Sequence, residues 1–335
     1  MEFSPLDTDQ TSEQDFQAIT ELFAAVAAID RPEWPPLSYE AAVGLLRSAV
    51  QTGPDPGAFW TARRDGQIVA VAYFELPREE NTSTAFISIR VHPGVWRQGI
   101  GTEFLRVLCS EAKSAGRTRI MGFPVRVGGS GEQWAERMGF VRTQPYIVQE
   151  LVISEVEPGL WDVPTAAGYR LEEWAGPAPE EIIASFARAR RAISDAPTGE
   201  MNYDDPDWTP ERVRMDETAR AAMGAEQRIV VAVHEDSGEV AGLTELNVFA
   251  REPEHGRQGD TAVLAQHRGH GLGRAMKSAM LRRLVVEHPD IVRVSTQTAA
   301  ENAYMAGVNH QIGCRTLWTH VYIEAELEAL EKRIG

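Results

Sequence analysis

Two short glycine-rich turns are the first positions in the sequence that suggest chemistry. Each lies between an apolar strand-like run and a helix-like run, with Gly99-Ile100-Gly101 in the first turn and Gly271-Leu272-Gly273 in the second. Glycine has no Cβ, so the backbone of such a turn can approach a ligand closely. The unpaired N–H groups and the positive dipole end of the following helix favour an anion. The turns therefore predict phosphate or pyrophosphate sites.

Metal and disulfide chemistry are not predicted. His267 and His270 lie in the second turn, but no third ligand has a suitable spacing, so we expect them to shape the turn or to face a phosphate. Cys109 and Cys314 both have apolar neighbours, which is typical of small core residues. Two cysteines are too few for a disulfide framework or a zinc site built from cysteines.

The turns belong to a tandem duplication. The chain has 335 residues, a length that favours two domains over one. Gly271 follows Gly99 by 172 residues, and the next matching pair, Gly139 and Gly313, is separated by 174. Nearly equal spacings of two landmarks indicate a repeat. The Pro- and Gly-containing segment 154–168 is typical of a linker, so we expect domains at 1–155 and 168–335.

Each copy has the same order of expected elements. Helix-like runs precede strand-like runs, the last of these strands leads into the glycine turn, and a helix with an apolar stripe follows it. The pattern predicts an α+β fold in which each domain has a mixed, mostly antiparallel sheet flanked by helices. The runs that carry this prediction are helices 22–29, 41–50, 182–193 and 302–313 and strands 66–76, 84–91, 228–236, 238–249, 261–264, 292–298 and 316–327.

Composition excludes some classes of partner. With 43% hydrophobic and 24% charged residues the chain has enough apolar side chains for two cores. The formal net charge of −16 disfavours nucleic acid and anionic lipid and permits a cationic substrate. No run approaches the ~18 apolar residues of a membrane span, and the polar, acidic N-terminus is unlike a signal peptide. We expect a soluble cytoplasmic protein, as a monomer or homodimer, without nucleic-acid or membrane partners.

The second turn carries a family resemblance. Residues 266–273 read QHRGHGLG, which resembles the acetyl-CoA loop Arg/Gln-x-x-Gly-x-Gly/Ala of the GNAT superfamily of N-acetyltransferases. Residues 302–313 are similar to the second motif of that family. The resemblance implies acetyl-CoA as cosubstrate, with the turn amides around its pyrophosphate, strand main chain along its pantetheine arm, and an asparagine near the same arm. The implied residues are Arg268, Gly269, His270, Gly271, Leu272, Gly273 and Arg274 for the turn, Val263 and Leu264 for the strand, and Asn302 for the second motif.

The first copy is less faithful to the family. Its strand end at Val91 and its turn at Gly99, Ile100 and Gly101 are kept, so a phosphate turn is still expected there. Trp96, however, replaces the arginine or glutamine of the motif, and segment 126–133 has no asparagine. We therefore expect the second domain to be catalytic and the first to be mainly structural, with coenzyme A binding still open to it. A dinucleotide site is disfavoured because no strand–helix–strand unit begins at these glycines.

Acetylation of an amine requires a base that removes a proton from the ammonium form. The carboxylates nearest to strand 261–264 are Glu245 and Asp260. Glu245 is the favoured base because its neighbours are apolar, and the alternative interpretation is a solvated residue on an outer face. Many relatives use a tyrosine of the second motif to protonate the leaving thiolate; here Asn309 has that position, and Tyr304 is the remaining candidate acid.

Acceptor binding is predicted for segment 194–217, because relatives shape the acceptor cleft between the corresponding helices. Carboxylates interleaved with aromatic faces suit an ammonium group. The alternative is a solvated acidic loop anchored by its aromatic residues. The candidate acceptor residues are Tyr203, Asp204, Asp205 and Trp208.

Three functions remain open. The first is an acetyl-CoA-dependent N-acetyltransferase that transfers acetyl to a primary, cationic amine by direct attack in the second domain; amine antibiotics, polyamines, protein lysines and N-termini are candidate acceptors. The second is a non-catalytic acyl-CoA binding or sensing protein. The third is an acyltransferase like the mycothiol synthases, which share the two-domain layout and acylate a sugar-linked cysteine.

Overall fold

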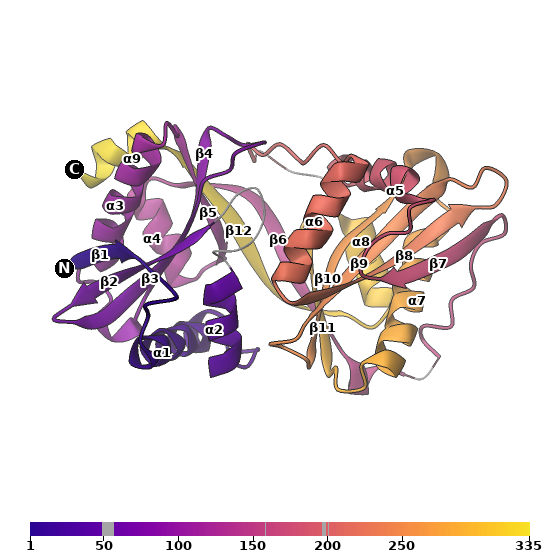
Figure 1. Cartoon of the computed structure of the whole chain (residues 1–335), viewed down its shortest axis with the longest axis horizontal. Coiled ribbons are helices and arrows are strands. Elements are labelled where there is room, and N and C mark those ends of the chain that lie inside the picture. Colours follow the sequence, from indigo (N-terminus) through magenta and orange to yellow (C-terminus); the bar gives the residue numbers. More distant parts are fainter. Residues whose placement is uncertain (49–56, 158, 196–198, 200) are drawn as a thin grey trace. The chain divides into compact units, whose positions relative to one another are not determined.

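The computed structural model describes residues 1–48, 57–157, 159–195, 199 and 201–335. These residues form two compact units: the first consists of Met1–Pro145, Gly199–Asp204 and His320–Gly335, and the second of Tyr146–Thr198 and Asp205–Thr319. Figure 1 labels the elements of both units. None of the helices in the described part of the chain combines the length and apolar character that a membrane span requires.

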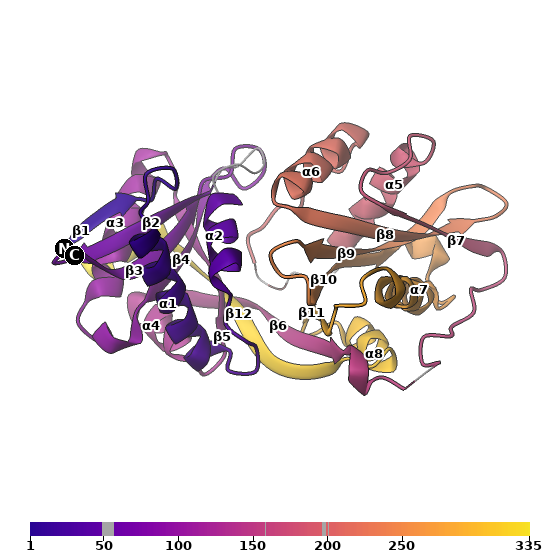
Figure 2. The same cartoon turned by 60° about the horizontal axis from the view of Figure 1, so that its bottom comes forward.

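The first unit contains a six-stranded sheet with helices on both faces. Its strand order is β1-β2-β3-β4-β5-β12, and every pair is antiparallel except β4 with β5. Helices α1 and α2 lie side by side on one face, as Figures 1 and 2 both show, while α3 and α9 cover the other. Its elements are β1 (Glu2–Pro5), α1 (Glu13–Asp30), α2 (Tyr39–Ser48), β2 (Ala58–Arg64), β3 (Gln67–Glu75), β4 (Thr84–Val91), α3 (Ile100–Ser114), β5 (Arg119–Arg126), α4 (Ser130–Met138), β12 (Arg315–Glu326) and α9 (Leu327–Ile334).

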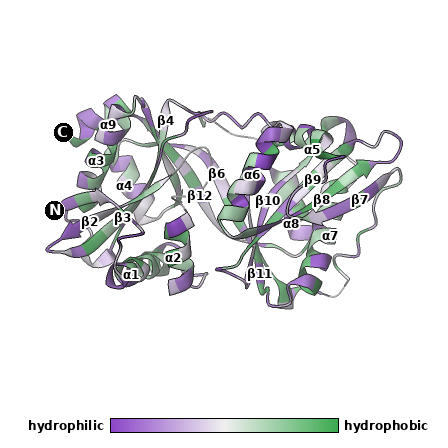
Figure 3. Cartoon of the chain, viewed as in Figure 1, coloured by the Kyte–Doolittle hydropathy of each residue, from purple (hydrophilic) through white to green (hydrophobic). Residues whose placement is uncertain are grey.

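The second unit repeats this plan with the order β6-β11-β10-β9-β8-β7, in which β10 and β11 are the parallel pair. Helix α7 covers one face, and α5 and α6 cover the other. Figure 3 shows apolar residues along β8 and β9 and polar residues on α6. Its elements are β6 (Val141–Val152), β7 (Tyr169–Ala175), α5 (Ile183–Arg190), α6 (Pro210–Ala222), β8 (Ala225–His234), β9 (Val240–Phe249), β10 (His255–Val263), α7 (Leu272–Glu287), β11 (Arg293–Ala299) and α8 (Ala303–Gln311).

Alternation along the strands explains the two-sided cores. In β3, Ala70 and Ala72 pack with α3, whereas Val71 packs with α1 and α2. In β8, Val230 packs with α7, whereas Ile229 packs with α5 and α6. Successive strand side chains point to opposite faces, so a strand that is apolar at every position needs helices on both sides. The predicted α+β fold with a mixed, flanked sheet in each copy is confirmed.

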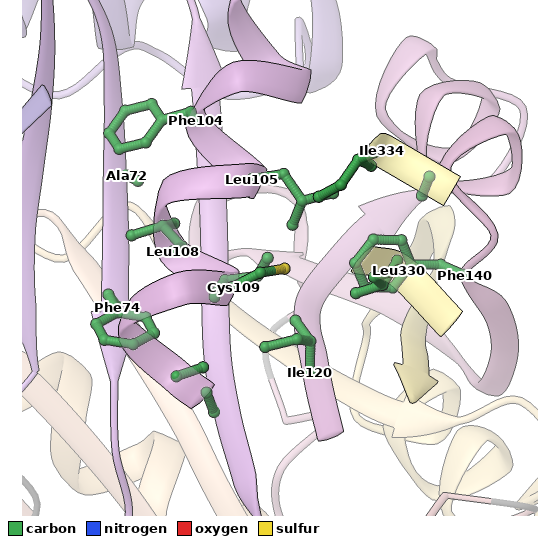
Figure 4. Close-up of a cluster of buried hydrophobic side chains, with 14 of the residues drawn as sticks. Ala72, Phe74, Phe104, Leu105, Leu108, Cys109, Ile120, Phe140, Leu330 and Ile334 are labelled. Carbon is green, nitrogen blue, oxygen red and sulfur yellow. The ribbon is translucent and has the colours of Figure 1, made fainter. Parts of the chain in front are cut away.

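The last strand of each sequence repeat completes the sheet of the other unit. Strand β12, from the second repeat, pairs with β5 from His320 opposite Arg126 to Glu326 opposite Arg119. Strand β6, from the first repeat, pairs with β11 from Tyr146 opposite Ala299 to Val152 opposite Arg293. Helix α9 continues from β12 into the core of the first unit, where Figure 4 labels Leu330 and Ile334. The compact units are therefore not the contiguous segments 1–155 and 168–335 of the sequence repeats.

Each parallel pair of strands separates part-way along its length. Strands β4 and β5 pair only over Thr84–Ile87 and Arg119–Gly122, and β10 and β11 only over His255–Arg257 and Arg293–Ser295. Beyond these residues all four strands continue, and each keeps its partner on the other side. Each glycine turn therefore follows a strand whose inner edge has backbone N–H and C=O groups that no longer bond to the neighbouring strand.

Candidate functional site

The second glycine turn joins the end of β10 to α7. A short 3₁₀ turn, Ala265–His267, follows β10, and Gly271 is the N-cap of α7 in the left-handed conformation with φ 71°. A Cβ placed on Gly271 would meet no atom within 4 Å, so the space beside the turn is open. Arg268 Nε donates to Val263 O at 3.0 Å, which holds the turn against the strand end. The predicted phosphate turn therefore has open space at a helix N-terminus.

The first unit builds the same turn with different side chains. Gly99 caps α3 in the left-handed conformation with φ 83°, after the 3₁₀ turn Pro93–Val95. Trp96 Nε1 donates to Val91 O at 2.6 Å, the hydrogen bond that Arg268 makes in the second unit. The exchange of arginine for tryptophan thus keeps the geometry of the turn and removes a positive charge.

Histidines fix the second turn to the sheet. His267 is buried; its Nδ1 lies 2.9 Å from Tyr169 Oη, and its Nε2 lies 3.3 Å from Glu239 Oε2. The Tyr169 ring also packs against the exposed His270, with ring centroids 5.4 Å apart. Of the two roles expected for His267, shaping the turn or facing a phosphate, these contacts support the first. Within the described ranges, no group of three or more His, Cys, Asp or Glu could hold a metal ion.

A β-bulge distinguishes the two units next to these turns. In the second unit Thr244 lies opposite Thr261 and Leu246 opposite Gln258, so two residues of β10, Gly259 and Asp260, face the single Glu245 of β9. In the first unit β3 and β4 pair one-for-one, and Tyr73 faces Ser88. A bulge leaves its extra residue out of the ladder and redirects its side chain. Of these two strand pairs, only β9 with β10 in the second copy has a bulge, and that bulge contains the carboxylate of Asp260.

Asp260 has a perturbed acidity. Solvent reaches its side chain, but surrounding protein atoms desolvate the carboxyl, and this burial together with the charge of Glu245 raises the pKa of Asp260 to about 6. The Arg190 and Arg220 guanidinium groups lower that pKa, and Asp205 raises it. An acid with this pKa is ionised at neutral pH and still accepts a proton readily.

Glu245 lies in a buried ion network instead. Its side chain is 1% exposed, its Oε1 lies 2.9 Å from Arg190, and Gln227 Nε2 donates to its Oε2 at 3.0 Å. Arg190 also pairs with Asp216 at 3.1 Å, and Asp216 pairs with Arg220 at 2.8 Å. The alternative interpretation of Glu245 as a solvated residue is wrong. Its carboxylate is already paired with Arg190 and Gln227 in the interior, whereas Asp260 lies in the bulge, so Asp260 is the more accessible of the two carboxylates.

The second motif has structural roles in α8. Asn302 is the N-cap of this helix, and its Oδ1 accepts from the Met305 N–H at 3.0 Å. Tyr304 is 65% exposed, and no contact within the described residues links it to Asp260. Asn309 is buried and donates to Gln149 Oε1 at 2.8 Å, so α8 is tied to the exchanged strand β6. None of these positions brings an acid to the bulge.

The candidate acceptor residues do not stay together. Residues 196–198 and 200 of that segment lie outside the described residues. Tyr203 packs edge-on against Phe86, and the Asp204 backbone pairs with the Asn81 side chain, both within the first unit. Trp208 is buried in the second unit, with Arg190 3.5 Å from its ring centroid, so Arg190 occupies the aromatic face that was expected to bind an acceptor. Asp205 shares the surroundings of Asp260.

Tyr146 is a site residue that sequence reasoning missed. Burial and the charges of Asp205 and Asp260 raise the pKa of its phenol. Tyr146 lies on β6, which belongs to the first repeat in sequence but to the second unit in structure. Its proximity to Asp260 depends on the strand exchange, and the repeat pattern alone contains no signal for it.

Comparison with known proteins identifies the family of the chain. The model of the acetyltransferase (GNAT) family matches residues 19–140 and 192–308, more than half of the chain, and each segment contains one glycine turn. No curated protein sequence matches the chain. A tandem GNAT protein from the clavulanic acid biosynthesis pathway is 26% identical, with a TM-score of 0.80 over 97% of this chain and 98% of that chain.

Two further structures share the fold. A GCN5-related N-acetyltransferase from Sphaerobacter thermophilus is 18% identical, with a TM-score of 0.71 over 97% of this chain and 96% of that chain. An acetyltransferase of the GNAT family from Colwellia psychrerythraea is 11% identical, with a TM-score of 0.54 over 97% and 99%. The chain therefore belongs to the acetyltransferase (GNAT) family, as an acyltransferase with two tandem GNAT domains.

Proposed function

We propose that the second unit is an acetyl-CoA-dependent N-acetyltransferase that transfers acetyl to a primary, cationic amine by direct attack. The observation that carries this assignment is the bulge of β10, which places Asp260 beside the separated edges of β10 and β11. The first unit has a comparable turn and comparable separated strands, but Ser88 and Tyr73 in place of the two carboxylates. The first unit is therefore proposed to be mainly structural.

Acetyl-CoA fits the groups that the second unit offers. The amides from Gly269 to Arg274 at the start of α7 would receive the pyrophosphate, whereas the expected Arg268 N–H is already paired with Ala265 O. Leu264 is already paired, with Ala241 O and with the His267 N–H, so it has less to offer the pantetheine arm than expected. Neighbouring strand residues direct their main-chain groups to opposite edges, so the Val263 N–H faces the edge that β11 leaves. The pantetheine amides can pair along that edge, with Asn302 at the start of α8 beyond it.

Asp260 supplies the proton acceptor for the reaction. The amine arrives as an ammonium ion, Asp260 takes one proton, and the neutral nitrogen attacks the thioester carbonyl. The C–N bond forms as the C–S bond breaks, and the nitrogen then releases its second proton to solvent to become the neutral amide. The departing thiolate is protonated from solvent, because neither Tyr304 nor Asn309 offers an acid at the bulge. Main-chain N–H groups freed by the bulge suit the negative charge that develops on the carbonyl oxygen.

Asp205 is proposed to help bind the cationic acceptor. Its charge raises the pKa of Asp260, and the charges of both carboxylates raise the pKa of Tyr146, so the two together can attract an ammonium ion. Asp205→Asn should raise the acceptor KM about two- to fivefold, the effect of one partly exposed ion pair, and leave the KM for acetyl-CoA unchanged. The matched control is Asp204→Asn, which makes the same charge change one residue earlier, in the first unit. Equal KM values for wild type and Asp205→Asn would remove Asp205 from the acceptor site.

The two glycine turns test which unit is catalytic. Gly271→Glu should reduce coenzyme A release from acetyl-CoA and a panel of amines by more than about 100-fold, because a carboxylate would stand where the pyrophosphate binds. Gly99→Glu is the matched control, since both glycines are left-handed N-caps with open space around them. It should retain activity, and mass spectrometry of the product identifies the acetylated amine.

Other outcomes of this assay favour other functions. Equal loss of activity in two folded variants would overturn the assignment to the second unit. Binding of acetyl-CoA without thiol release from any amine would indicate an acyl-CoA binding protein. Acetylation of a cysteinyl amino sugar alone would favour the mycothiol-synthase-like alternative.

A further inference from the structure

A neutral set of four charged side chains, two of them buried and two partly exposed, lies beneath the β10 bulge. Arg190 and Arg220 come from α5 and α6, Glu245 from β9, and Asp216 from α6. We propose that Glu245 is a positioning residue for the reaction: held across the bulge from Asp260, it engages Arg190 and so keeps Asp260 available as a proton acceptor. This inference rests on the proposed role of Asp260 in acetyl transfer.

The contacts show that the arginines are already occupied. Arg190 is 2% exposed and lies 2.9 Å from Glu245 and 3.1 Å from Asp216, with its guanidinium stacked on the Trp208 ring. Arg220 lies 2.8 Å from Asp216 and 3.9 Å from Glu245. Two cations and two anions balance one another, so Asp260 is an additional negative charge beside a neutral set. Without Glu245, Arg190 and Arg220 would share the single carboxylate of Asp216, and Asp260 is the nearby carboxylate that could restore the balance.

Cross-strand hydrogen bonds fix Glu245 relative to the bulge. A Cβ built on Gly259 would lie 3.6 Å from Glu245 Cβ and 3.7 Å from its Oε2, so the Glu245 side chain lies under the bulge. Gln258 Nε2 donates to Thr244 Oγ1 at 3.0 Å and also to the Glu245 carbonyl. On the other side of the bulge, Thr244 and Thr261 hydroxyls are 2.7 Å apart. Both ends of the bulge are thereby tied to β9.

The charges around Asp260 predict whether each variant raises or lowers the pKa of this carboxyl. Burial, Glu245 and Asp205 raise the pKa of Asp260 to about 6, and Arg190 and Arg220 oppose them. Tyr146 on β6 lies within the electrostatic reach of this carboxyl, whose charge raises the pKa of the phenol. Removing the charge of Glu245 should therefore lower the pKa of Asp260, and removing the charge of Arg220 should raise it. If Glu245 and Arg220 had purely structural roles, removing the charge of either would not shift the pKa of Asp260 in opposite directions.

The test is the acid limb of kcat/KM, measured against pH with acetyl-CoA and the best amine of the panel. Glu245→Gln should move this limb about one pH unit lower, and Arg220→Gln about one unit higher, the size of shift that a near charge produces. Arg220→Lys keeps the charge and should leave the limb in place. Glu245→Gln removes one of the two ion partners of the buried Arg190 and can therefore destabilise the fold. Asp216→Asn removes the other carboxylate of the set instead, and it should also move the acid limb to lower pH.

A second readout does not depend on activity. The Asp260 carboxyl is titrated by ¹³C NMR of protein with labelled aspartate, with the resonance assigned by its loss in Asp260→Asn, and its midpoint should move as the limb does. Unshifted midpoints in folded Glu245→Gln and Arg220→Gln would overturn the inference. Full activity of Asp260→Asn would instead overturn the proposed base. If Asp260→Asn is inactive but the Asp260 titration midpoint is unchanged in Glu245→Gln and Arg220→Gln, only the positioning role of Glu245 is overturned.

Discussion

Asp260→Asn lowers kcat/KM at pH 7 by about 10²–10⁴-fold, the usual contribution of a positioned general base. The amide has nearly the same shape as the carboxylate but cannot accept the ammonium proton. The measurement is initial-rate release of coenzyme A with saturating acetyl-CoA. Ser88→Ala is the matched control, because Ser88 has the corresponding position in the unbulged strand of the first unit, and this variant should keep the wild-type rate.

The ionisation of Asp260 should be visible in the pH dependence of kcat/KM of the wild-type enzyme. Since the pKa of Asp260 is raised to about 6 and the base acts when ionised, kcat/KM should be level above that pH and fall about tenfold per unit below it. The fall should disappear in Asp260→Asn. Wild-type kinetics in the folded Asp260→Asn variant, with an unchanged acid limb, would assign the proton transfer to another group.

Leu330→Ala in α9 should lower the free energy of unfolding of the first unit by about 2–5 kcal/mol, the usual cost of removing a buried leucine side chain. Leu330 is 1% exposed and belongs to the core cluster of the first unit, together with Leu105, Ile120 and Phe140 (Figure 4). Hydrogen exchange should show faster opening of α3, because α3 packs on the same core. The exposed Val286 of α7 gives the control, and Val286→Ala should leave stability within about 0.5 kcal/mol.

The result depends on which unit α9 serves. Peptides from α3 should lose protection in Leu330→Ala, while peptides from α7 keep theirs. Loss of protection in α7 with no change in α3 would mean that the C-terminal helix stabilises the second unit, contrary to its packing in the structure.

The glycine turns could be predicted because their chemistry is local. Gly99 and Gly271 are helix N-caps with positive φ, a conformation that favours glycine. In the sequence they are recognisable as glycines between a strand-like and a helix-like apolar run. The duplication then predicted two α+β units of one plan. Trp96 was less predictable: its type differs from Arg268, but both side chains present an N–H donor to the end of the strand.

The strand exchange could not be predicted, because strand propensity does not specify a partner. Strands β6 and β12 are apolar and extended whichever sheet they join, and their register with β11 and β5 is a tertiary property. The position of Tyr146 beside Asp260 depends on that register.

The ranking of the two carboxylates depended on long-range contacts. Apolar neighbours of Glu245 indicated burial, which is correct, but the cation that stabilises it there is Arg190, on another element. The bulge, by contrast, has a faint sequence signal. Ile87 corresponds to Gln258, 171 residues later, whereas Ile89 corresponds to Thr261, 172 residues later, so the second copy has one extra residue at Asp260. Recognising it requires the strand pairing of both copies.

The exchanged strands also determine the order in which the chain can be completed during synthesis. Arg119 of β5 and Glu326 of β12 are hydrogen-bonded although 207 residues separate them. Most of the first unit is synthesised before the second, yet its sheet lacks β12 and its core lacks α9 until residues 315–334 have been made. Contacts this distant in sequence form slowly. The nascent first unit therefore presents an open sheet edge at β5 until β12 has been synthesised, a state in which β-strands associate with wrong partners and chaperones bind.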